Sequence, residues 1–270
     1  MKIFFAGPVA GWELILQYRP PYLLESFYTL SRSRKRQYYI DTMLQNTKIF
    51  LLDSGAFTFM NTLTDITEKE LDYFVEDYAK FIVDNDIQLF FEMDVDAVLG
   101  YEKVLEYRKF LEKTTKKKCI PVWHRSRGYE EWKKMLNSGY KIVAIGGFVI
   151  KEIKLPKELP YVNTLIKQAH RKNILVHGLG VSGFSYLNKT LFDSVDSTSW
   201  VQAPAYGRIA FIDINRKTII SKSKHEVVGG NKRGIHSKLR RLTLKKWLYV
   251  VKQFDNEEWD FLKTYNKEVE

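Results

Sequence analysis

Short runs of β-forming residues alternate with longer amphipathic stretches along almost the whole chain, and this alternation limits the possible folds more than any other feature. Eight such runs begin at residues 2, 48, 87, 118, 141, 173, 191 and 208, and they read KIFFAG, KIFLLDSG, IQLFFEMDV, KCIPVWH, KIVAIGGF, NILVHGLG, LFDSVDS and RIAFIDI. This order is typical of a parallel sheet covered by helices. Eight strands in 270 residues predict an α/β fold, a (β/α)8 barrel of the TIM type, although a doubly wound open sheet would show the same alternation.

The stretches between these runs predict helices. In residues 67–85 the apolar side chains recur at helical spacing from Leu71 to Ile82, and Thr67 is suited to cap the N-terminus. Further helices are expected at residues 101–116, 129–136, 161–171 and 242–265, and no clear helix between residues 197 and 207. We therefore expect a single barrel over residues 1–215, followed by a basic loop and a C-terminal helix, residues 216–270, that packs on it.

Polar residues close most of the predicted strands. In a barrel the carboxyl ends of all strands meet at one face, where the chemistry is found. Taken singly, each residue has an ordinary explanation, because Asp and Ser often cap helices and glycine pairs often form turns. Together they indicate one shared site, made of Asp53, Ser54, Glu92, Asp94, Asp96, His124, Gly146, Gly147, His177, Gly178, Asp193 and Asp196. Residues 92, 94 and 96 alternate along a strand and are expected to share one of its faces.

The charge of the chain favours a polyanionic partner. The formal net charge is +11, from 43 Lys and Arg against 32 Asp and Glu, which is typical of proteins that bind nucleic acid. A solvated loop and helix face would explain the C-terminal basic residues equally well. The candidate phosphate contacts are Arg125 and Arg127, near the predicted carboxyl face, and Lys232, Arg233, Lys238, Arg240 and Arg241 in the C-terminal stretch.

Several classes of site are absent from the sequence. A single cysteine, Cys119, excludes an internal disulfide and a cysteine-based zinc cluster, and this usage fits a reducing compartment. No HExxH, Walker or GxGxxG motif is present, so we expect neither a metal nor a cofactor. No run approaches the roughly 18 apolar residues of a membrane span, so we expect no membrane partner and a cytoplasmic protein.

Four segments, in this order, resemble the tRNA-guanine transglycosylases (queuine tRNA-ribosyltransferases) and their relatives that place 7-deazaguanines in DNA. LLDSGAF, residues 51–57, resembles the family's DSGGF motif, and VAIGGF, residues 143–148, resembles its AIGGL segment. VHGLGV, residues 176–181, is similar to the family's MGVG strand. DSTSWVQAPAYGRI, residues 196–209, matches the DSASY segment and the following GR of archaeal members. PVWHRS, residues 121–126, stands where the family has VVQGG or VVQGS, so His124 replaces a base-reading glutamine.

The resemblance implies roles for these residues. Asp196 would be the nucleophile that attacks the sugar carbon bearing the guanine, and Asp53 would be the general acid/base. Asp94 would accept hydrogen bonds from the guanine edge. An alternative register aligns LFDS with the family's catalytic segment and makes Asp193 the nucleophile. The expected substrate-binding residues are Ser54, Phe57 (stacking on the base), Asp94, His124, Gly146, Gly147, Phe148, His177 and Gly178.

The same resemblance favours DNA as the polymer. Bacterial tRNA enzymes of the family carry a zinc subdomain built from three cysteines and a histidine, which one cysteine cannot supply. The stretch after residue 207 is short for the RNA-binding domain of archaeal members, and this chain is most similar to the phage and bacterial enzymes that exchange guanine in DNA. The expected partners are therefore DNA, with tRNA as the alternative, and a 7-deazaguanine base, with a phage-encoded enzyme acting in the host cytoplasm as one source.

Two other hypotheses stay open, a catalytically silent relative that binds nucleic acid and a barrel enzyme that acts on a phosphorylated metabolite.

An enzyme that exchanges guanine in duplex DNA must flip the guanine out of the duplex, and the candidates to fill the space it leaves are Trp123, Trp200 and Tyr206.

Overall fold

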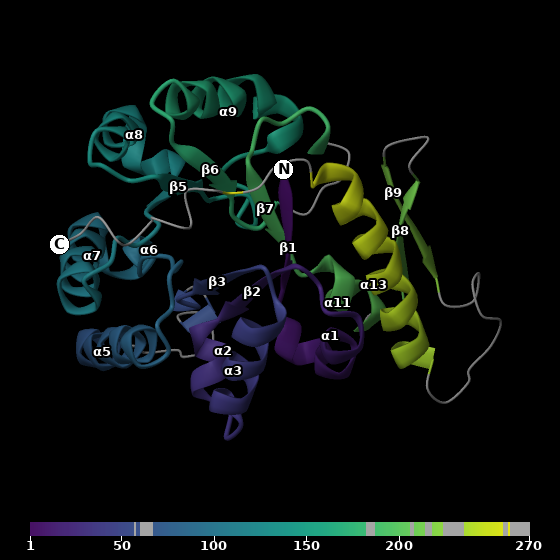
Figure 1. The fold of residues 1–270 in the computed structure, drawn as a ribbon. Coiled ribbons are helices and arrows are strands. Elements are labelled where there is room, and N and C mark those ends of the chain that lie inside the picture. Colours follow the sequence, from purple (N-terminus) through teal and green to yellow (C-terminus); the bar gives the residue numbers. More distant parts are fainter. Residues whose placement is uncertain are drawn as a thin grey trace.

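A curled parallel sheet of seven strands forms the centre of a mixed α/β structure (Figure 1). The computed structural model describes residues 1–56, 58–59, 67–181, 187–205, 208–213, 218–223, 235–255 and 259. The strand order is β3-β2-β1-β7-β6-β5-β4, and every pair is parallel. The strands are β1 (Lys2–Ala6), β2 (Tyr22–Ser26), β3 (Ile49–Asp53), β4 (Val122–Trp123), β5 (Ile142–Ile145), β6 (Leu175–Gly178) and β7 (Ser194–Ser197).

The two edges of this sheet are linked through one short segment. Isolated parallel bridges join Leu52 to Phe90 and Phe91 to Ile120. The N–H of Phe91 donates to the carbonyl of Leu52 at 2.9 Å, and the N–H of Ile120 donates to the carbonyl of Phe90 at 2.7 Å. The segment around Phe90 therefore lies between edge strand β3 and residue 120, just before edge strand β4, and the curled sheet brings its edges together there.

Helices surround the sheet, as Figure 1 shows. The predicted cap at residue 67 is confirmed, because the N–H of Glu70 donates to Thr67 Oγ1 at 3.3 Å and the N–H of Thr67 donates to Glu70 Oε2 at 2.9 Å. This capping box satisfies two helix-end donors and fixes where the helix begins. The helices are α1 (Trp12–Tyr18), α2 (Phe27–Ser31), α3 (Arg36–Asn46), α5 (Glu68–Asp84), α6 (Asp96–Leu99), α7 (Tyr101–Thr115), α8 (Gly128–Leu136), α9 (Leu155–His170), α11 (Ser199–Ala205) and α13 (Ile235–Phe254).

The predicted strands differ from the structure at three places. The run at residues 87–95 forms only isolated bridges, at Phe90 and Phe91. β2 was not predicted, and the run that begins at residue 208 is not part of the parallel sheet. Its strand β8 (Arg208–Asp213) instead pairs antiparallel with β9 (Thr218–Ser223), in a hairpin that crosses the expected domain boundary at residue 215. β-propensity indicates a strand but does not identify its partner, which explains why the run that begins at residue 208 was assigned to the parallel sheet.

The predicted helices also need correction. α11 lies within residues 197–207, where no helix was expected, and α9 begins at Leu155 and contains Pro160. α13 covers Ile235–Phe254 rather than residues 242–265. The packing of α11 and α13 against other elements, rather than a strong local pattern, decides these boundaries.

α13 runs along the side of the sheet, and its contacts show which of its ends lies at the carboxyl ends of the strands. The ring of Trp247 lies 6.0 Å from that of Phe5 in β1, and the helix separates the sheet from the β8–β9 hairpin (Figure 1). The Met1 amino group donates to the carbonyl of Phe254, and Arg240 Nη1 donates to the carbonyl of Ala10. The first half of α13 therefore lies toward the carboxyl ends of the strands.

Candidate active site

Two aspartates from separate strands meet at the carboxyl edge of the sheet. Asp53 is the last residue of β3, and its Oδ2 accepts the N–H of Gly55 at 3.1 Å. Burial and then the charges of Asp196 and Asp94 together raise the pKa of Asp53 to about 7, although the Gly55 hydrogen bond lowers it. A carboxyl group with this pKa exchanges a proton readily near neutral pH.

Asp196, in β7, is buried and held from one side. Its Oδ1 accepts the N–H of Gly180 at 2.6 Å and lies 3.2 Å from His177 Nε2. The other imidazole nitrogen of His177 lies 2.8 Å from Ser194 Oγ, so the ring is fixed in turn. Among the described residues no hydrogen bond reaches Asp196 Oδ2, which leaves that oxygen for a reacting group.

His177 contacts Asp196 from inside the curled sheet. Its side chain is fully buried, and its ring lies 5.9 Å from that of Phe4 and 5.3 Å from that of Phe91. These contacts come from other segments of the curled sheet, so the ring points into its interior. His177 is therefore placed to position Asp196, and its direct binding of a substrate stays a prediction.

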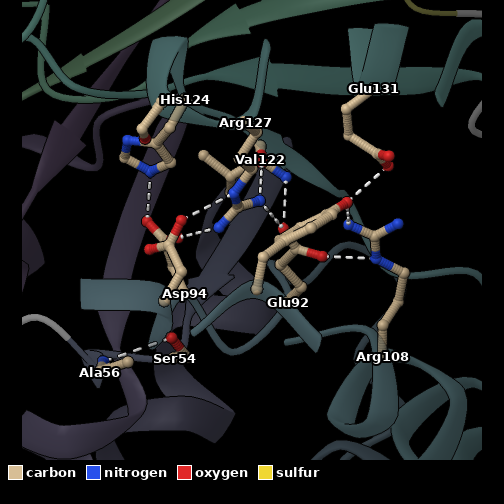
Figure 2. Close-up of polar contacts among 12 residues, drawn as sticks. Ser54, Ala56, Glu92, Asp94, Arg108, Val122, His124, Arg127 and Glu131 are labelled. Atoms are coloured by element: carbon tan, nitrogen blue, oxygen red, sulfur yellow. Dashed lines mark hydrogen bonds and ion pairs between the residues drawn. The ribbon is translucent and has the colours of Figure 1, made fainter. Parts of the chain in front are cut away.

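The next acidic residues along the edge surround one arginine, as Figure 2 shows. Arg127 donates through Nη1 to Glu92 at 2.9 Å, through Nη2 to Asp94 at 2.6 Å and through Nε to Asp96 at 2.9 Å. The three carboxylates converge on Arg127, but not as the predicted alternation along a strand, because residues 92–95 follow the bridges at Phe90 and Phe91 as a loop and Asp96 begins α6. Arg108 Nε binds the other oxygen of the fully buried Glu92 at 2.6 Å, so cations offset the crowded negative charges.

This network corrects the role expected for Arg127. Its side chain is only 1% exposed, and its guanidinium is occupied by three carboxylates. A phosphate group cannot reach it without displacing them. Arg125, by contrast, is half exposed and pairs with Glu158 beside the ring of Tyr161. Arg125 therefore stays a candidate phosphate contact.

His124 lies between two carboxylates. Its Nε2 is 2.6 Å from Asp94 Oδ2 (Figure 2), and its Nδ1 is 3.2 Å from Glu152 Oε2. Burial lowers the pKa of His124, but the hydrogen bond and charge of Asp94 outweigh it, and the net shift is upward. Burial raises the pKa of Asp94, but His124 and Arg127 outweigh it, and the net shift is downward. An imidazolium and an ionised Asp94 therefore form a stable pair at this edge.

Glycine is needed at the two predicted positions after β5 for different structural reasons. A Cβ at Gly146 would lie 2.8 Å from the ring of His124, so the glycine makes room for that ring. Gly147 has φ +83°, where only glycine is unstrained, and a Cβ there would meet Glu152 at 2.8 Å. Both glycines therefore let the chain pass close to the His124 and Glu152 side chains.

The remaining predicted substrate residues surround these groups. Ser54 is buried and its Oγ accepts the N–H of Ala56 at 3.3 Å (Figure 2). The ring of Phe148 is partly buried, 5.9 Å from that of Phe192. A Cβ at Gly178 would also meet Phe192 at 2.9 Å. Phe57 lies outside the described residues.

Asp193 does not join the site. It precedes β7, at the opposite end of the strand from Asp53 and its neighbours. Its Oδ2 accepts the N–H of Val176 at 2.7 Å and lies 2.9 Å from His170 Nε2. The register that made Asp193 the nucleophile is therefore wrong, because the strand direction places its carboxylate at the amino edge of the sheet.

Glu25, a further carboxylate at the same edge, was not among the predicted site residues. Glu25 lies near the end of β2 and is 1% exposed, and its two oxygens accept the N–H groups of Val9 and Ser26, each at 2.9 Å. Burial raises the pKa of Glu25 to about 7, and the charge of Asp53 contributes to the shift. An acid at the end of the apolar run YLLES was the available signal, and it was lost because β2 was not predicted.

The structure describes three of the five predicted nucleic-acid contacts in the C-terminal stretch, and all three lie on α13. Lys238 and Arg241 are exposed, and with Lys245 and Lys252 they recur at helical spacing along one face. Arg240 is half-buried and binds the carbonyl of Ala10 at 3.1 Å. Lys232 and Arg233 lie outside the described residues. The basic face begins near the carboxyl edge of the sheet and extends along the molecule.

The two described tryptophans that were candidates to fill the space of a flipped base are both held in the protein interior. Trp123 and Trp200 are fully buried, and Trp200 Nε1 donates to the carbonyl of Ala6 at 2.8 Å. Tyr206 lies outside the described residues. Within the described part of the chain, no three His, Cys, Asp or Glu residues form a group suited to a metal ion. No helix among the described residues is both long and apolar enough to cross a membrane.

No protein-family model matches this sequence, and no curated protein is significantly similar to it. Among solved structures, the chain is similar to a "putative fructose-1,6-biphosphate aldolase" from Coccidioides immitis, with a TM-score of 0.57 and 9% identity over 94% of this chain and 89% of that chain. It also matches 3-dehydroquinate dehydratase from Geobacillus kaustophilus, with a TM-score of 0.48 and 14% identity over 73% and 80% of the two chains. The carboxyl transferase domain of Rhizobium etli pyruvate carboxylase matches with a TM-score of 0.46 and 14% identity, over 97% of this chain and 50% of that chain. The first similarity supports a TIM-barrel-like fold and carries no information on substrate.

Proposed function

We propose that this protein is a transglycosylase that exchanges guanine in DNA for a 7-deazaguanine base through a covalent aspartyl-glycosyl intermediate. The observation that carries the proposal is the meeting of Asp53 and Asp196 at one edge of the sheet, in different environments. Asp53 is buried with a pKa raised to about 7, and Asp196 is held through one oxygen by the Gly180 N–H at 2.6 Å and by His177 Nε2 at 3.2 Å. Two carboxyl groups in contrasting environments are suited to acid/base and nucleophilic roles.

In the first half of the proposed reaction, Asp196 Oδ2 attacks C1′ of the deoxyribose. A C1′–O bond forms, and the C1′–N9 bond breaks with its electron pair leaving on the guanine. Asp53, protonated near neutral pH, donates its proton to the departing base. The covalent ester keeps the sugar carbon in place while the bases exchange.

In the second half the roles reverse. Asp53, now a carboxylate, takes the N9 proton of the incoming 7-deazaguanine, and N9 attacks C1′. The C1′–O bond breaks, and Asp196 leaves as a carboxylate. Protons and electron pairs balance over the cycle, and neither a metal nor a redox cofactor is required. This is the retaining logic of two carboxylates acting in turn.

Asp94 is the proposed reader of the guanine edge. Each of its oxygens already accepts one donor, from His124 and from Arg127, both at 2.6 Å. A carboxylate oxygen has a second lone pair, so Asp94 can still accept from N1–H and the exocyclic amino group. Its lowered pKa keeps it acceptor-only, which favours purines that present these donors.

Two further features support the proposal. The exposed basic face of α13 begins near the carboxyl edge of the sheet and offers cations to a DNA backbone. Two isolated parallel bridges join Leu52 in β3 to Phe90, and Phe91 to Ile120, which precedes β4. We propose on this basis a complete eight-stranded barrel in which residues 89–92 act as the fourth strand, and a barrel concentrates side chains from all strands at its carboxyl face.

The test is base exchange with purified protein. Duplex DNA and tRNA, each labelled in guanine, are incubated separately with a panel of 7-deazaguanines, and label release is followed for the wild type, Asp196→Asn and Asp193→Asn. We expect release from DNA that Asp196→Asn abolishes and Asp193→Asn retains, with a protein–DNA ester detected by mass spectrometry in the wild type. Release from tRNA alone would identify tRNA, rather than DNA, as the substrate. Binding without release from either polymer would contradict the proposal and favour a silent nucleic-acid-binding protein.

A further inference from the structure

Two large apolar side chains stand in solvent at the edge that carries the aspartates. Val149 is 65% exposed and Ile150 is 54% exposed, and Val149 is the most exposed large apolar side chain in the described part of the chain. Both follow the two glycines after β5. Exposed apolar residues of this size, adjacent in sequence and next to a candidate site, indicate a surface that contacts another molecule.

A tight turn holds these two side chains outward. The N–H of Lys151 donates to the carbonyl of Phe148 at 3.3 Å, so Val149 and Ile150 occupy the two corner positions. A second hydrogen bond, from the N–H of Ile153 to the carbonyl of Gly147 at 3.2 Å, closes the base of the turn. Turn corners usually carry Gly, Pro, Asn, Asp or Ser, so two β-branched apolar residues are unusual there.

The turn is fixed between the two halves of the candidate site. On one side Glu152 lies 3.2 Å from His124, which pairs with Asp94. On the other side, Val149 Cγ2 lies 2.6 Å from the position that a Cβ would take on Gly180, whose N–H binds Asp196. The apolar tip therefore stands next to the proposed nucleophile.

We propose that Val149 and Ile150 enter the base stack of duplex DNA and fill the space left by the flipped guanine. This inference rests on the proposed DNA base exchange and adds the element that opens the duplex. Apolar side chains that insert between base steps are a known means of unstacking DNA, and an enzyme acting on a base must take it out of the stack. The exposed Lys151 and Lys154 beside the tip supply cations for the flanking phosphates.

The test compares Val149→Ser/Ile150→Ser with the wild type on matched substrates. The control is Val83→Ser, the same change at a 51% exposed valine on α5, outside the proposed site. The substrates are duplex DNA, the same labelled strand without its complement, and a duplex with an abasic site opposite the target guanine. A second readout is the fluorescence of 2-aminopurine placed opposite the target guanine, which rises when stacking is lost. Thermal melting confirms that each variant is folded.

We expect the double variant to lose about tenfold or more in exchange on duplex DNA and to keep nearly full activity on the other two substrates, where unstacking is already achieved. Its 2-aminopurine signal should also fall, while Val83→Ser matches the wild type. Equal activity of the double variant on duplex DNA would overturn the inference, and so would an equal loss on all three substrates. Loss of binding to anionic phospholipid vesicles in the variant, with exchange unchanged, would assign the tip to a membrane instead.

Failure of the proposed function gives a different result. If the wild type exchanges no base in any substrate, the 2-aminopurine signal decides the inference alone. A signal that depends on Val149 and Ile150 would support duplex opening without exchange, and no signal in the wild type would overturn it.

Discussion

Replacing Asp53 by asparagine removes a carboxyl group that the folded protein holds at an unfavourable pKa. The pKa of Asp53 is raised from 3.8 to about 7, mainly by burial and then by the charge of Asp196. The unfolded chain loses this proton at lower pH than the folded chain, so the folded state is progressively destabilised as the pH rises from about 4 to about 7. An asparagine side chain keeps the size and the hydrogen-bond acceptor but does not ionise.

The magnitude follows from the size of the shift. About three pKa units at roughly 1.36 kcal/mol each set a ceiling of about 4 kcal/mol at pH 8 and above. Because Asp53 is partly exposed, solvent screens part of this energy, and we expect Asp53→Asn to gain about 2 kcal/mol at pH 8 and less than about 1 kcal/mol at pH 5. Base exchange should fall by about a hundredfold or more, because the general acid/base is gone.

The assay is urea unfolding at pH 5 and pH 8, beside the control Asp77→Asn, which changes an exposed carboxylate on α5. The control should show no gain that depends on pH. An Asp53→Asn gain that is equal at the two pH values, or a loss that is larger at pH 8, would refute the reasoning that burial and Asp196 raise the pKa.

Three further outcomes are expected. Arg127→Leu removes the buried cation that Glu92, Asp94 and Asp96 share and should cost about 3–5 kcal/mol in urea unfolding, whereas Arg125→Leu should cost less than about 1 kcal/mol; equal costs would contradict the buried network. The pKa of His124 is raised in the folded protein, so protonation of His124 stabilises the fold below its ordinary pKa, and this stability is lost as the pH rises through the raised pKa. His124→Gln removes this contribution, so its loss of melting temperature relative to the wild type should be larger at pH 6 than at pH 9. An equal loss at the two pH values would contradict this. Removing three exposed charges of α13 should reduce the slope of log affinity for DNA against log salt by about 3, while the same number removed from α5 and α7 should leave it unchanged; the triple variants are Lys238→Gln/Arg241→Gln/Lys245→Gln and Lys80→Gln/Lys109→Gln/Lys113→Gln.

The sequence located several parts of the site correctly. Asp53 and Asp196 close apolar runs, and the structure brings both to one edge because parallel strands share a direction. Glu92, Asp94 and Asp96 were correctly expected near one another, although a loop and the start of α6 bring them together rather than a strand. The placement of Asp53 and Asp196 depends on strand direction, which the apolar runs of the local sequence record.

Other parts needed contacts between distant segments. Arg127 was expected to face a phosphate, because a sequence does not show that three carboxylates from residues 92–96 will surround it. Glu25 was missed together with β2, whose strand is recognisable mainly from its pairing with β1 and β3. The run at residues 208–214 was assigned to the barrel because its apolar pattern fits a parallel or an antiparallel partner equally well.

The sequence by itself therefore determined the α/β class, the order of most strands and helices, and the position of the acidic residues at strand ends. Only the tertiary structure decided which carboxylates are paired and which keep a free oxygen, that Asp193 lies at the far edge, and that Val149 and Ile150 project beside Asp196. The physical reason is that periodicity and capping act within a few neighbouring residues. Burial, charge neutralisation and pKa depend instead on segments that the fold brings together from more than a hundred residues apart, as Asp53 and Asp196 do.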